Sequence, residues 1–466
     1  MDTIQYDAIV IGFGEAGKSI VADLANRGNT VAMIEQSKGS YGGKCINIGC
    51  IPSKNLIQEA SQIKKCQLKN YRQKAKAYRQ AIEKKRQWES ALRNEHVHTL
   101  ADRENVTVYN GVGSFVSDSV IAVNDGDDEW RLTGTHIFIN TGFVADNEPP
   151  IKGLHESKHV FNSTSIMNLK QLPRRIAIIG AGSVGLEFAS MYANFGSKVM
   201  VFDSLNTFMP MEDRDMADTV KEVMERQGID FHLGTIVEKM KDVERGSIIY
   251  YKDQTGHPQE MITEVILIAP GRTLNTKELQ STDIQQNENG SFTVDGHLQS
   301  SFPNVYAIGN AGRGSRFMHA SLDDYRIVMD DLEVQRNKTT KEQEIVPYSL
   351  FFDPPFSRVG LTEKEAKEQG YSYKAILIPV SYIQKAEWLE VTEGKLKVIV
   401  DEMSGLILGC ALFCAESQEL INLIHQAMKS NQSYEVLRDQ IFTNEIMSEA
   451  VHDLFKTVKD LKNETI

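Results

Sequence analysis

Short apolar runs followed by glycine-rich turns occur twice along the chain and set the expected architecture. The first run covers residues 8–11 and the second covers residues 176–179, and each passes through a G-x-G-x-x-G sequence into a segment expected to be helical. A wholly apolar run of this length is typical of a strand buried on both faces of a parallel sheet and followed by a crossover helix. The pattern therefore predicts an α/β fold with two strand–turn–helix units.

Both units continue in the same way, into a second strand that ends in an acidic residue. Residues 30–34 lead to Glu35 and residues 198–202 lead to Asp203, and each acid follows the first glycine of its unit at the same spacing. In dinucleotide-binding folds the glycines let a pyrophosphate approach the helix N-terminus, and the acid accepts hydrogen bonds from ribose hydroxyls. The sequence thus predicts two dinucleotide sites, formed by Gly12, Gly14, Gly17 and Glu35, and by Gly180, Gly182, Gly185 and Asp203.

Two cysteines closely follow the first unit. Cys45 and Cys50 lie in residues 42–54, which read GGKCINIGCIPSK, and four residues separate the two sulfurs. On the first turns of a helix this spacing places both sulfurs on one face, near enough to form a disulfide, and helix-end amides favour the thiolate. A dithiol beside a dinucleotide site indicates flavin-linked redox chemistry, so we assign FAD to the first unit and a nicotinamide cofactor to the second.

The nicotinamide cofactor is expected to be NADH rather than NADPH. Asp203 would repel a 2′-phosphate, and residues 204–206, which read SLN, provide no guanidinium to bind one. Arg214 lies further along the chain and could still reach such a phosphate, so NADPH stays open at this point.

Length, composition and charge fit a soluble enzyme of two or three domains. The 466 residues exceed what one core usually serves, and a net charge of −12 argues against nucleic-acid binding. We see no signal peptide and no stretch long enough to span a membrane, so a cytoplasmic location is expected. In a reducing compartment a close Cys45–Cys50 pair is catalytic, whereas Cys410 and Cys414 are expected to be core thiols.

With these motifs the chain resembles the class I pyridine nucleotide-disulfide oxidoreductases, a family of flavoproteins, over almost its full length. Residues 140–142 and 269–272 resemble the family's connections between its FAD and NAD domains, and residues 306–310 resemble its second FAD motif, which normally ends in Asp rather than Asn. The resemblance implies further cofactor contacts from Gly43, Lys54, Thr141, Gly142, Gly309, Asn310, Gly271 and Arg272.

The same resemblance implies a domain order and roles within the dithiol site. It predicts an FAD-binding domain from residues 1–150 and 271–345, an NAD(P)H-binding domain from 151–270 and an α+β dimerisation domain from 346–466. Lys54 and Glu187 occupy the positions of the family's ion pair beside the flavin. By position, Cys50 is the flavin-side thiol and Cys45 is the thiol that meets the substrate. No metal site is expected.

The C-terminal region departs from the family at one position. We expect strands at 395–400 and 406–414, helices at 417–430 and 447–462, and a homodimer whose active site is shared across the interface. The family supplies a His and a Glu from this domain to the partner's disulfide, but alignment on Glu449 places Asn444 at the His position. An amide cannot carry a proton near neutral pH, and a desolvated Glu445 is the alternative acid.

This departure bears on the substrate, a small-molecule oxidant. Residues 41–54, 187–199, 321–328 and 437–442 resemble the reactive-chlorine resistance branch of the family, which is associated with hypothiocyanous acid reduction. In that reaction the Cys45 thiolate would attack the substrate sulfur, and Cys50 would then release thiocyanate, which leaves without a proton. The alternatives are a thiol-disulfide reductase, a copper or mercury reductase, and an inactive dimeric flavoprotein that acts as a binding or sensing module.

The long basic stretch at residues 58–105 has a less specific interpretation. It is rich in Lys and Arg and is expected to be helical. A pair of solvated helices explains it better than docking of an anionic partner does.

Overall fold

Each glycine-rich unit belongs to its own sheet in the structure, a computed structural model that describes residues 2–145, 149–279, 283–313, 318–333, 335–343 and 345–458. The first sheet has parallel strands in the order β3, β2, β1, β6, with β17 also paired to β6, and antiparallel β5 and β4 extend it. Its strands are β1 (Thr3–Ile11), β2 (Val31–Glu35), β3 (Val106–Asn110), β4 (Val112–Phe115), β5 (Val120–Asn124), β6 (Glu129–Ile139) and β17 (Val305–Ala307). Helix α1 (Glu15–Asn26) joins β1 to β2 and packs against α8 (Met318–Leu332).

The second sheet is wholly parallel, in the order β11, β10, β9, β15, β8. Its strands are β8 (Val160–Asn162), β9 (Arg175–Ile179), β10 (Lys198–Phe202), β11 (Ile229–His232) and β15 (Val265–Ile268). Helices α5 (Ser183–Phe195) and α6 (Arg214–Arg226) connect its successive strands, and a small antiparallel sheet adjoins it, made of β12 (Ile236–Val243), β13 (Gly246–Lys252) and β14 (Pro258–Thr263). The repeated pattern in the sequence therefore corresponds to two separate Rossmann-type units.

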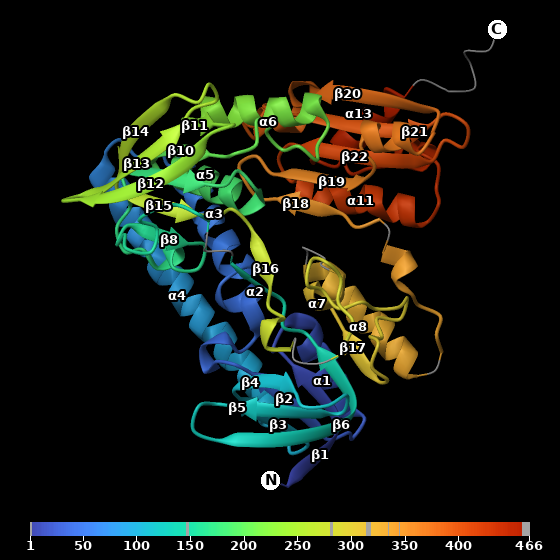
Figure 1. Cartoon of the computed structure of the whole chain (residues 1–466). Coiled ribbons are helices and arrows are strands. Elements are labelled where there is room, and N and C mark those ends of the chain that lie inside the picture. Colours follow the sequence, from blue (N-terminus) through green and yellow to red (C-terminus); the bar gives the residue numbers. More distant parts are fainter. Residues whose placement is uncertain are drawn as a thin grey trace.

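A two-stranded antiparallel ribbon connects these two parts of the molecule. The chain leaves the first part through β7 (Phe143–Ala145) and returns through β16 (Arg272–Leu274), with Arg272 opposite Ala145. In Figure 1 β16, the labelled strand of this ribbon, lies between the blue and cyan strands of the first sheet below and the green second sheet above. The short elements that follow are η3 (Lys277–Leu279), α7 (Asn310–Arg313) and η4 (Thr340–Gln343).

The C-terminal part is an antiparallel sheet covered by helices, drawn in orange and red in Figure 1. Its strands, in spatial order, are β18 (Tyr348–Leu350), β19 (Phe356–Gly360), β22 (Ile407–Phe413), β21 (Lys395–Asp401) and β20 (Tyr373–Pro379). The helices are α9 (Glu363–Glu368), η5 (Val380–Tyr382), α10 (Gln384–Trp388), α11 (Ser417–Lys429), α12 (Glu435–Asp439) and α13 (Glu449–Lys456). Cys410 and Cys414 are buried in its core, as the sequence predicted.

The predicted α/β class, with two Rossmann-type units and an α+β C-terminal part, is confirmed. The three domain ranges themselves stay a prediction. One helix differs from expectation: α13 begins at Glu449 rather than 447, because residues 444–448 form turns in which the Glu445 N–H donates to the Glu449 carboxylate at 2.9 Å. The helix also ends earlier than the expected residue 462, at Lys456, and residues 459–462 of the expected range lie outside the described residues.

The basic stretch at 58–105 forms the end of α3 (Cys50–Lys65) and α4 (Tyr71–Ala101), but it is not simply solvated. Tyr78 of α4 is fully buried, with its ring centroid 6.2 Å from that of Tyr192 and 5.0 Å from that of Phe195, both on α5. Lys85 is only 1% exposed and forms an ion pair with Glu89 at 3.1 Å. The expectation of a solvated pair was therefore wrong for the face of α4 that covers the second unit.

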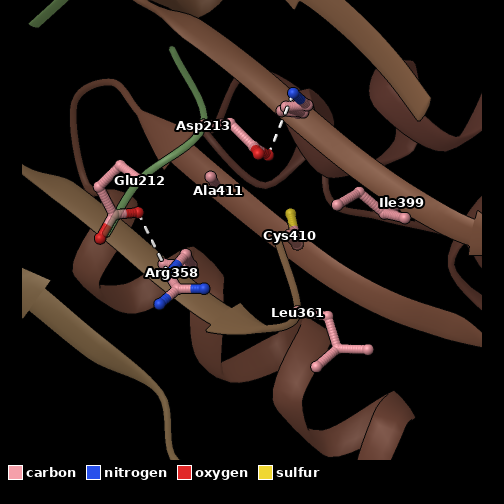
Figure 2. A pocket seen from close by; sticks show the side chains of 8 residues that line it. Glu212, Asp213, Arg358, Leu361, Ile399, Cys410 and Ala411 are labelled. Atoms are coloured by element: carbon pink, nitrogen blue, oxygen red, sulfur yellow. Dashed lines mark ion pairs between the residues drawn. The ribbon is translucent and has the colours of Figure 1, made fainter. Parts of the chain in front are cut away.

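A charge cluster around one buried lysine joins the second Rossmann-type unit to the C-terminal sheet. Lys397 of β21 is 2% exposed and contacts Asp213 at 3.1 Å and Asp215 at 2.7 Å, both at the start of α6, together with Glu363 of α9. Figure 2 shows the neighbouring pair of Glu212 and Arg358 in the same joint, where Nε lies 3.2 Å from the carboxylate. A cavity of about 10 Å³ lies among these residues, near the size of one water molecule.

We predict that Lys397→Met lowers the free energy of unfolding by about 1.5 to 3 kcal/mol, because it removes the buried cation from three carboxylates that are themselves only partly buried. Lys252→Met is the matched control: its pair with Glu238 is about half exposed, and its loss should cost less than about 1 kcal/mol. Urea unfolding of both variants measures the difference. Equal losses of unfolding free energy in the two variants would show that Lys397 does not stabilise the contact between the second unit and the C-terminal sheet.

Candidate active site

A cavity of about 570 Å³ opens where β1, β2 and β6 end and where the cysteine-bearing helices begin. Its wall brings together most of the residues predicted for the first dinucleotide, which are Gly12, Gly14, Glu35, Gly43, Thr141, Gly142, Arg272 and Asn310, and it also includes Cys45 and Cys50. Gly17 and Gly309 are not among the lining residues, and they lie in α1 and just before α7. Segments distant in sequence thus form one site.

The glycine-rich turns of the two units share one geometry. Gly12 has φ 106°, and a Cβ at this position would lie 2.4 Å from the carbonyl oxygen of Asn140. Gly180 has φ 109°, and its Cβ would lie 2.3 Å from the carbonyl oxygen of Ala269. Only glycine allows this backbone conformation at such a close approach, which explains why the motif recurs at equivalent places.

The acid at the end of the second strand is tied to the glycine turn in both units. The Phe13 N–H donates to the Glu35 carboxylate at 3.1 Å, and the Ala181 N–H donates to the Asp203 carboxylate at 2.6 Å. Burial raises the pKa of Glu35. Each acid therefore stands at a fixed place beside the turn, where a ribose would be bound.

The cavity fits FAD by the polar atoms that it leaves unsatisfied. Lys44 Nζ, Asn140 Nδ2 and Thr141 Oγ1 are buried without a hydrogen-bond partner, and all three residues line the wall. Buried polar atoms are normally paired, so three such atoms around one cavity indicate a polar ligand. FAD bound here would supply the acceptor oxygens of its pyrophosphate and ribityl chain, and its ring would accept and pass on electron pairs.

The two cysteines come from different helices rather than from one. Cys45 lies within α2 (Gly43–Asn47), and Cys50 is the first residue of α3, since the chain leaves helical geometry at Ile48 and Gly49. The expected shared helix face was therefore wrong. A hydrogen bond between the two thiols nevertheless acts on the pKa of both, so the break between the helices still brings the sulfurs together.

The two thiols have opposite electrostatic tendencies. The hydrogen bond from Cys45 lowers the pKa of Cys50 to about 6, and the charges of Lys54 and Arg272 add to this, against the effect of burial. The pKa of Cys45 is raised, first because its proton is held in the hydrogen bond to Cys50 and then because of burial. Of the two reduced thiols, Cys50 is therefore the one favoured to lose its proton first.

Lys54 and Glu187 form the predicted ion pair, with Nζ 2.6 Å from the carboxylate. The other carboxylate oxygen of Glu187 accepts the Phe351 N–H at 3.0 Å, and Lys54 Nζ lies 4.9 Å from the centre of the Phe351 ring. A residue of the C-terminal part thus fixes the pair between α3 and α5. Neither residue lines the cavity itself, and Lys54 acts on the site through its charge near Cys50.

In the second unit, backbone carbonyl groups hold the side chain of Arg214. Its guanidinium donates to the carbonyl oxygens of Phe208 at 2.7 Å, Met209 at 2.5 Å and Glu212 at 2.8 Å. The Asp203 carboxylate also accepts the Leu205 N–H at 2.8 Å and remains partly exposed.

The residues predicted for the shared active site do not reach the cavity of their own chain. Asn444 is exposed in the turn before α13, and Glu449, at the start of that helix, holds this turn through the Glu445 N–H. Glu445 has φ 65°, in the left-handed region. The described residues that line the cavity include none from this segment.

The structure adds three residues to the site for which the sequence analysis predicted no role. Lys44 stands within the cysteine motif, directly before Cys45, and that position was the signal available. Asn140 likewise precedes Thr141. Asp324 is 1% exposed on α8 and accepts the Gly309 N–H at 2.7 Å, and burial raises its pKa to about 6. It holds the turn that presents Asn310, which no local pattern indicates.

Comparison with known proteins identifies the family. Residues 6–323 match the pyridine nucleotide-disulphide oxidoreductase family, and residues 346–455 match its dimerisation domain. The chain belongs to this family and is an FAD- and pyridine nucleotide-dependent oxidoreductase with a dimerisation domain. No helix in the described residues has the length and apolar character needed to cross a membrane.

Among its relatives, the chain is 40% identical to the probable pyridine nucleotide-disulfide oxidoreductase RclA of Escherichia coli K12, over 98% of this chain and all of that protein. It is 28% identical to a mercuric reductase of Staphylococcus aureus, over 96% of this chain and 81% of that protein. The solved structure of the HOCl-induced flavoprotein disulfide reductase RclA from E. coli matches with a TM-score of 0.90 and 39% identity, over 97% of this chain and all of that one. The chain is thus a flavoprotein disulfide reductase of the RclA type.

Proposed function

We propose that this protein uses NADH to reduce hypothiocyanous acid through the Cys45–Cys50 pair, as a defence against reactive chlorine species. The observation that carries the proposal is the dithiol on the wall of the flavin cavity, formed by Cys45 and Cys50, together with the amide of Asn444 where the family has a proton-carrying His. The lowered pKa of Cys50 and the raised pKa of Cys45 agree with it. Similarity to RclA, whose structure is described as that of an HOCl-induced reductase, supports the same assignment.

The reaction needs no further acid in this arrangement. The Cys45 sulfur bonds to the sulfur of hypothiocyanous acid, the S–O bond breaks, and the Cys45 proton leaves with the oxygen as water. The Cys50 thiolate then attacks the Cys45 sulfur, forms the disulfide and releases thiocyanate, a stable anion. The proton leaves Cys45 as its sulfur bonds to the substrate, so the sulfur attacks with thiolate character and the departing oxygen receives the proton that it requires.

With FAD held in the cavity, an electron pair from NADH would return the Cys45–Cys50 disulfide to the dithiol, so that overall NADH and hypothiocyanous acid would give NAD⁺, thiocyanate and water. A cytoplasmic homodimer with an active site shared across the interface is part of the proposal. NADH rather than NADPH is supported by Asp203 and by Arg214, whose guanidinium is occupied by three carbonyl groups.

The test is NADH consumption by the FAD-loaded enzyme with hypothiocyanous acid, glutathione disulfide and Cu(II) in turn. We expect one thiocyanate per NADH, and a rate with glutathione disulfide that is lower by about 10²- to 10⁴-fold, because that leaving thiolate requires a general acid. Equal rates with both substrates would overturn the assignment. No consumption with any oxidant would favour the inactive binding module.

Copper reduction is the second candidate, because another solved structure is a Cu(II) complex of E. coli RclA, at 40% identity. Among the described residues no group of three or more His, Cys, Asp or Glu side chains could hold a metal ion. Faster NADH consumption with Cu(II) than with hypothiocyanous acid would favour this alternative.

A further inference from the structure

Lys44 is the one cation among the three unsatisfied groups of the FAD cavity. Its Nζ is buried and has no hydrogen-bond partner, and no carboxylate of the described residues lies within 4.0 Å of it. A lysine ammonium is a threefold donor that is expensive to bury alone. An unpaired ammonium that lines a cavity therefore indicates an anionic group of the ligand.

The backbone fixes where along the cavity this ammonium lies. A Cβ on Gly43 would lie 2.8 Å from the Cα of Gly14, so the residue before Lys44 packs directly on the turn that starts α1. On the other side, a Cβ on Gly142 would lie 3.8 Å from Lys44 Nζ and 3.7 Å from the Asn310 amide oxygen. Lys44 thus stands between the N-terminus of α1 and the end of β6.

Two other parts of the wall mark the ends of the ligand. The Glu35 carboxylate marks the ribose end, and Cys50 marks the end where a redox-active ring must approach the dithiol. The contacts of Gly43 with Gly14 and of Lys44 with Gly142 place Lys44 between those ends. The group of FAD between the adenosine ribose and the ribityl chain is the pyrophosphate, and the N-terminus of α1 is the usual place for it.

We propose that Lys44 is a pyrophosphate-binding residue of the FAD site, whose ammonium forms an ion pair with the diphosphate and completes the anion site at the N-terminus of α1. The acid at that N-terminus is already neutralised, because Glu15 pairs with Lys18 at 2.7 Å. Lys44 therefore supplies net positive charge to the site. Asn310, where the family has Asp, keeps a second carboxylate away from the same region.

The proposal has a proton linkage with a defined sign. Burial lowers the pKa of Lys44 to about 8 in the protein alone, with Glu35 opposing and Arg272 adding to the shift. A bound diphosphate favours the charged form and raises that pKa, so FAD affinity should be constant below pH 8 and fall by up to about tenfold per pH unit above it. The titratable and charged groups on the same wall are Glu15, Glu35, Cys45, Cys50, Arg272 and Glu278.

The experiment measures FAD release from diluted holoenzyme by flavin fluorescence, together with the ³¹P NMR shifts of the bound diphosphate. Lys44→Met should weaken FAD binding by about 10- to 100-fold, remove the pH dependence above pH 8 and move the ³¹P signals. Lys44→Arg should keep tight binding but lose the same pH dependence, because a guanidinium stays charged. The control is Lys38→Met, an exposed lysine of η1 (Lys38–Ser40) that does not line the cavity.

Unchanged FAD affinity and ³¹P shifts in Lys44→Met would overturn the proposal. So would a wild-type affinity that stays flat between pH 7 and about pH 10, or a Lys44→Arg variant that retains the full pH dependence. The Lys44→Arg and wild-type measurements decide the question even if Lys44→Met does not fold, and none of them depends on the oxidant.

Discussion

Cys45→Ser is expected to lower the turnover of hypothiocyanous acid by at least about 10³-fold while leaving the Cys50 thiolate in place. The variant lacks the sulfur that we propose bonds to the substrate. A serine hydroxyl can still donate a hydrogen bond to Cys50, and that hydrogen bond is the largest cause of its lowered pKa. The measurements are NADH-dependent turnover and a pH titration of the absorbance band that a thiolate gives beside oxidised flavin.

Cys45→Ala is the matched variant, because it removes the donor as well as the sulfur. In the Ser variant the band should appear near the value for Cys50, about pH 6, since a hydroxyl replaces the thiol as donor. In the Ala variant it should appear only at clearly higher pH, because Lys54 and Arg272 alone then oppose the effect of burial. Identical titrations for Ser and Ala would show that the hydrogen bond does not set the thiolate. Substantial turnover in the Ser variant would assign the substrate-binding thiol to Cys50.

The dinucleotide units were predictable because their geometry depends on residues close together in sequence. Gly12 and Gly180 need positive φ and a close backbone approach, and the acids Glu35 and Asp203 follow at a spacing that one crossover helix determines. The residues that determine each glycine turn and its acid can therefore be recognised in the sequence alone, and both units appear in the structure as expected.

Features that depend on distant segments were not predictable in this way. The Lys54–Glu187 pair was expected, but its third partner, the Phe351 N–H, comes from the C-terminal part of the chain. The unpaired state of Lys44 becomes visible only when Gly14 and Gly142 are brought to it by different strands. Whether a side chain such as Lys44 is buried, and whether it has a partner, depends on the folded site. Neither the periodicity nor the spacing of residues in the sequence predicts it.

The break between α2 and α3 shows why a spacing argument alone is weak over short distances. Gly49 has φ −129° and ψ −113°, a backbone conformation outside the helical region, and it ends the continuity that the shared-face argument assumed. The two sulfurs still lie close together, because the break changes the direction of α3 relative to α2. The correct outcome, a close dithiol, thus followed from the motif and not from helix geometry.

Asn444→His is expected to convert the enzyme toward ordinary disulfide substrates. A histidine at this position would restore the proton carrier of the family, so the rate with glutathione disulfide should rise by about 10²- to 10⁴-fold. The rate with hypothiocyanous acid should change by less than about threefold, because Cys45 provides the only proton that our mechanism requires. Backbone strain should not interfere, since Glu445 rather than Asn444 has the positive φ in this turn.

The two substrates measured side by side, each as a function of pH, separate the possible outcomes. The new disulfide activity should follow the titration of a histidine near pH 6.5, whereas Asn444→Gln, which keeps an amide, should gain nothing. If the rate with hypothiocyanous acid also rises by about 10²-fold, that substrate requires an external acid and the proton assignment to Cys45 is wrong. If neither rate changes, Asn444 does not face the partner's dithiol, and the missing histidine is not what restricts the enzyme to substrates with good leaving groups.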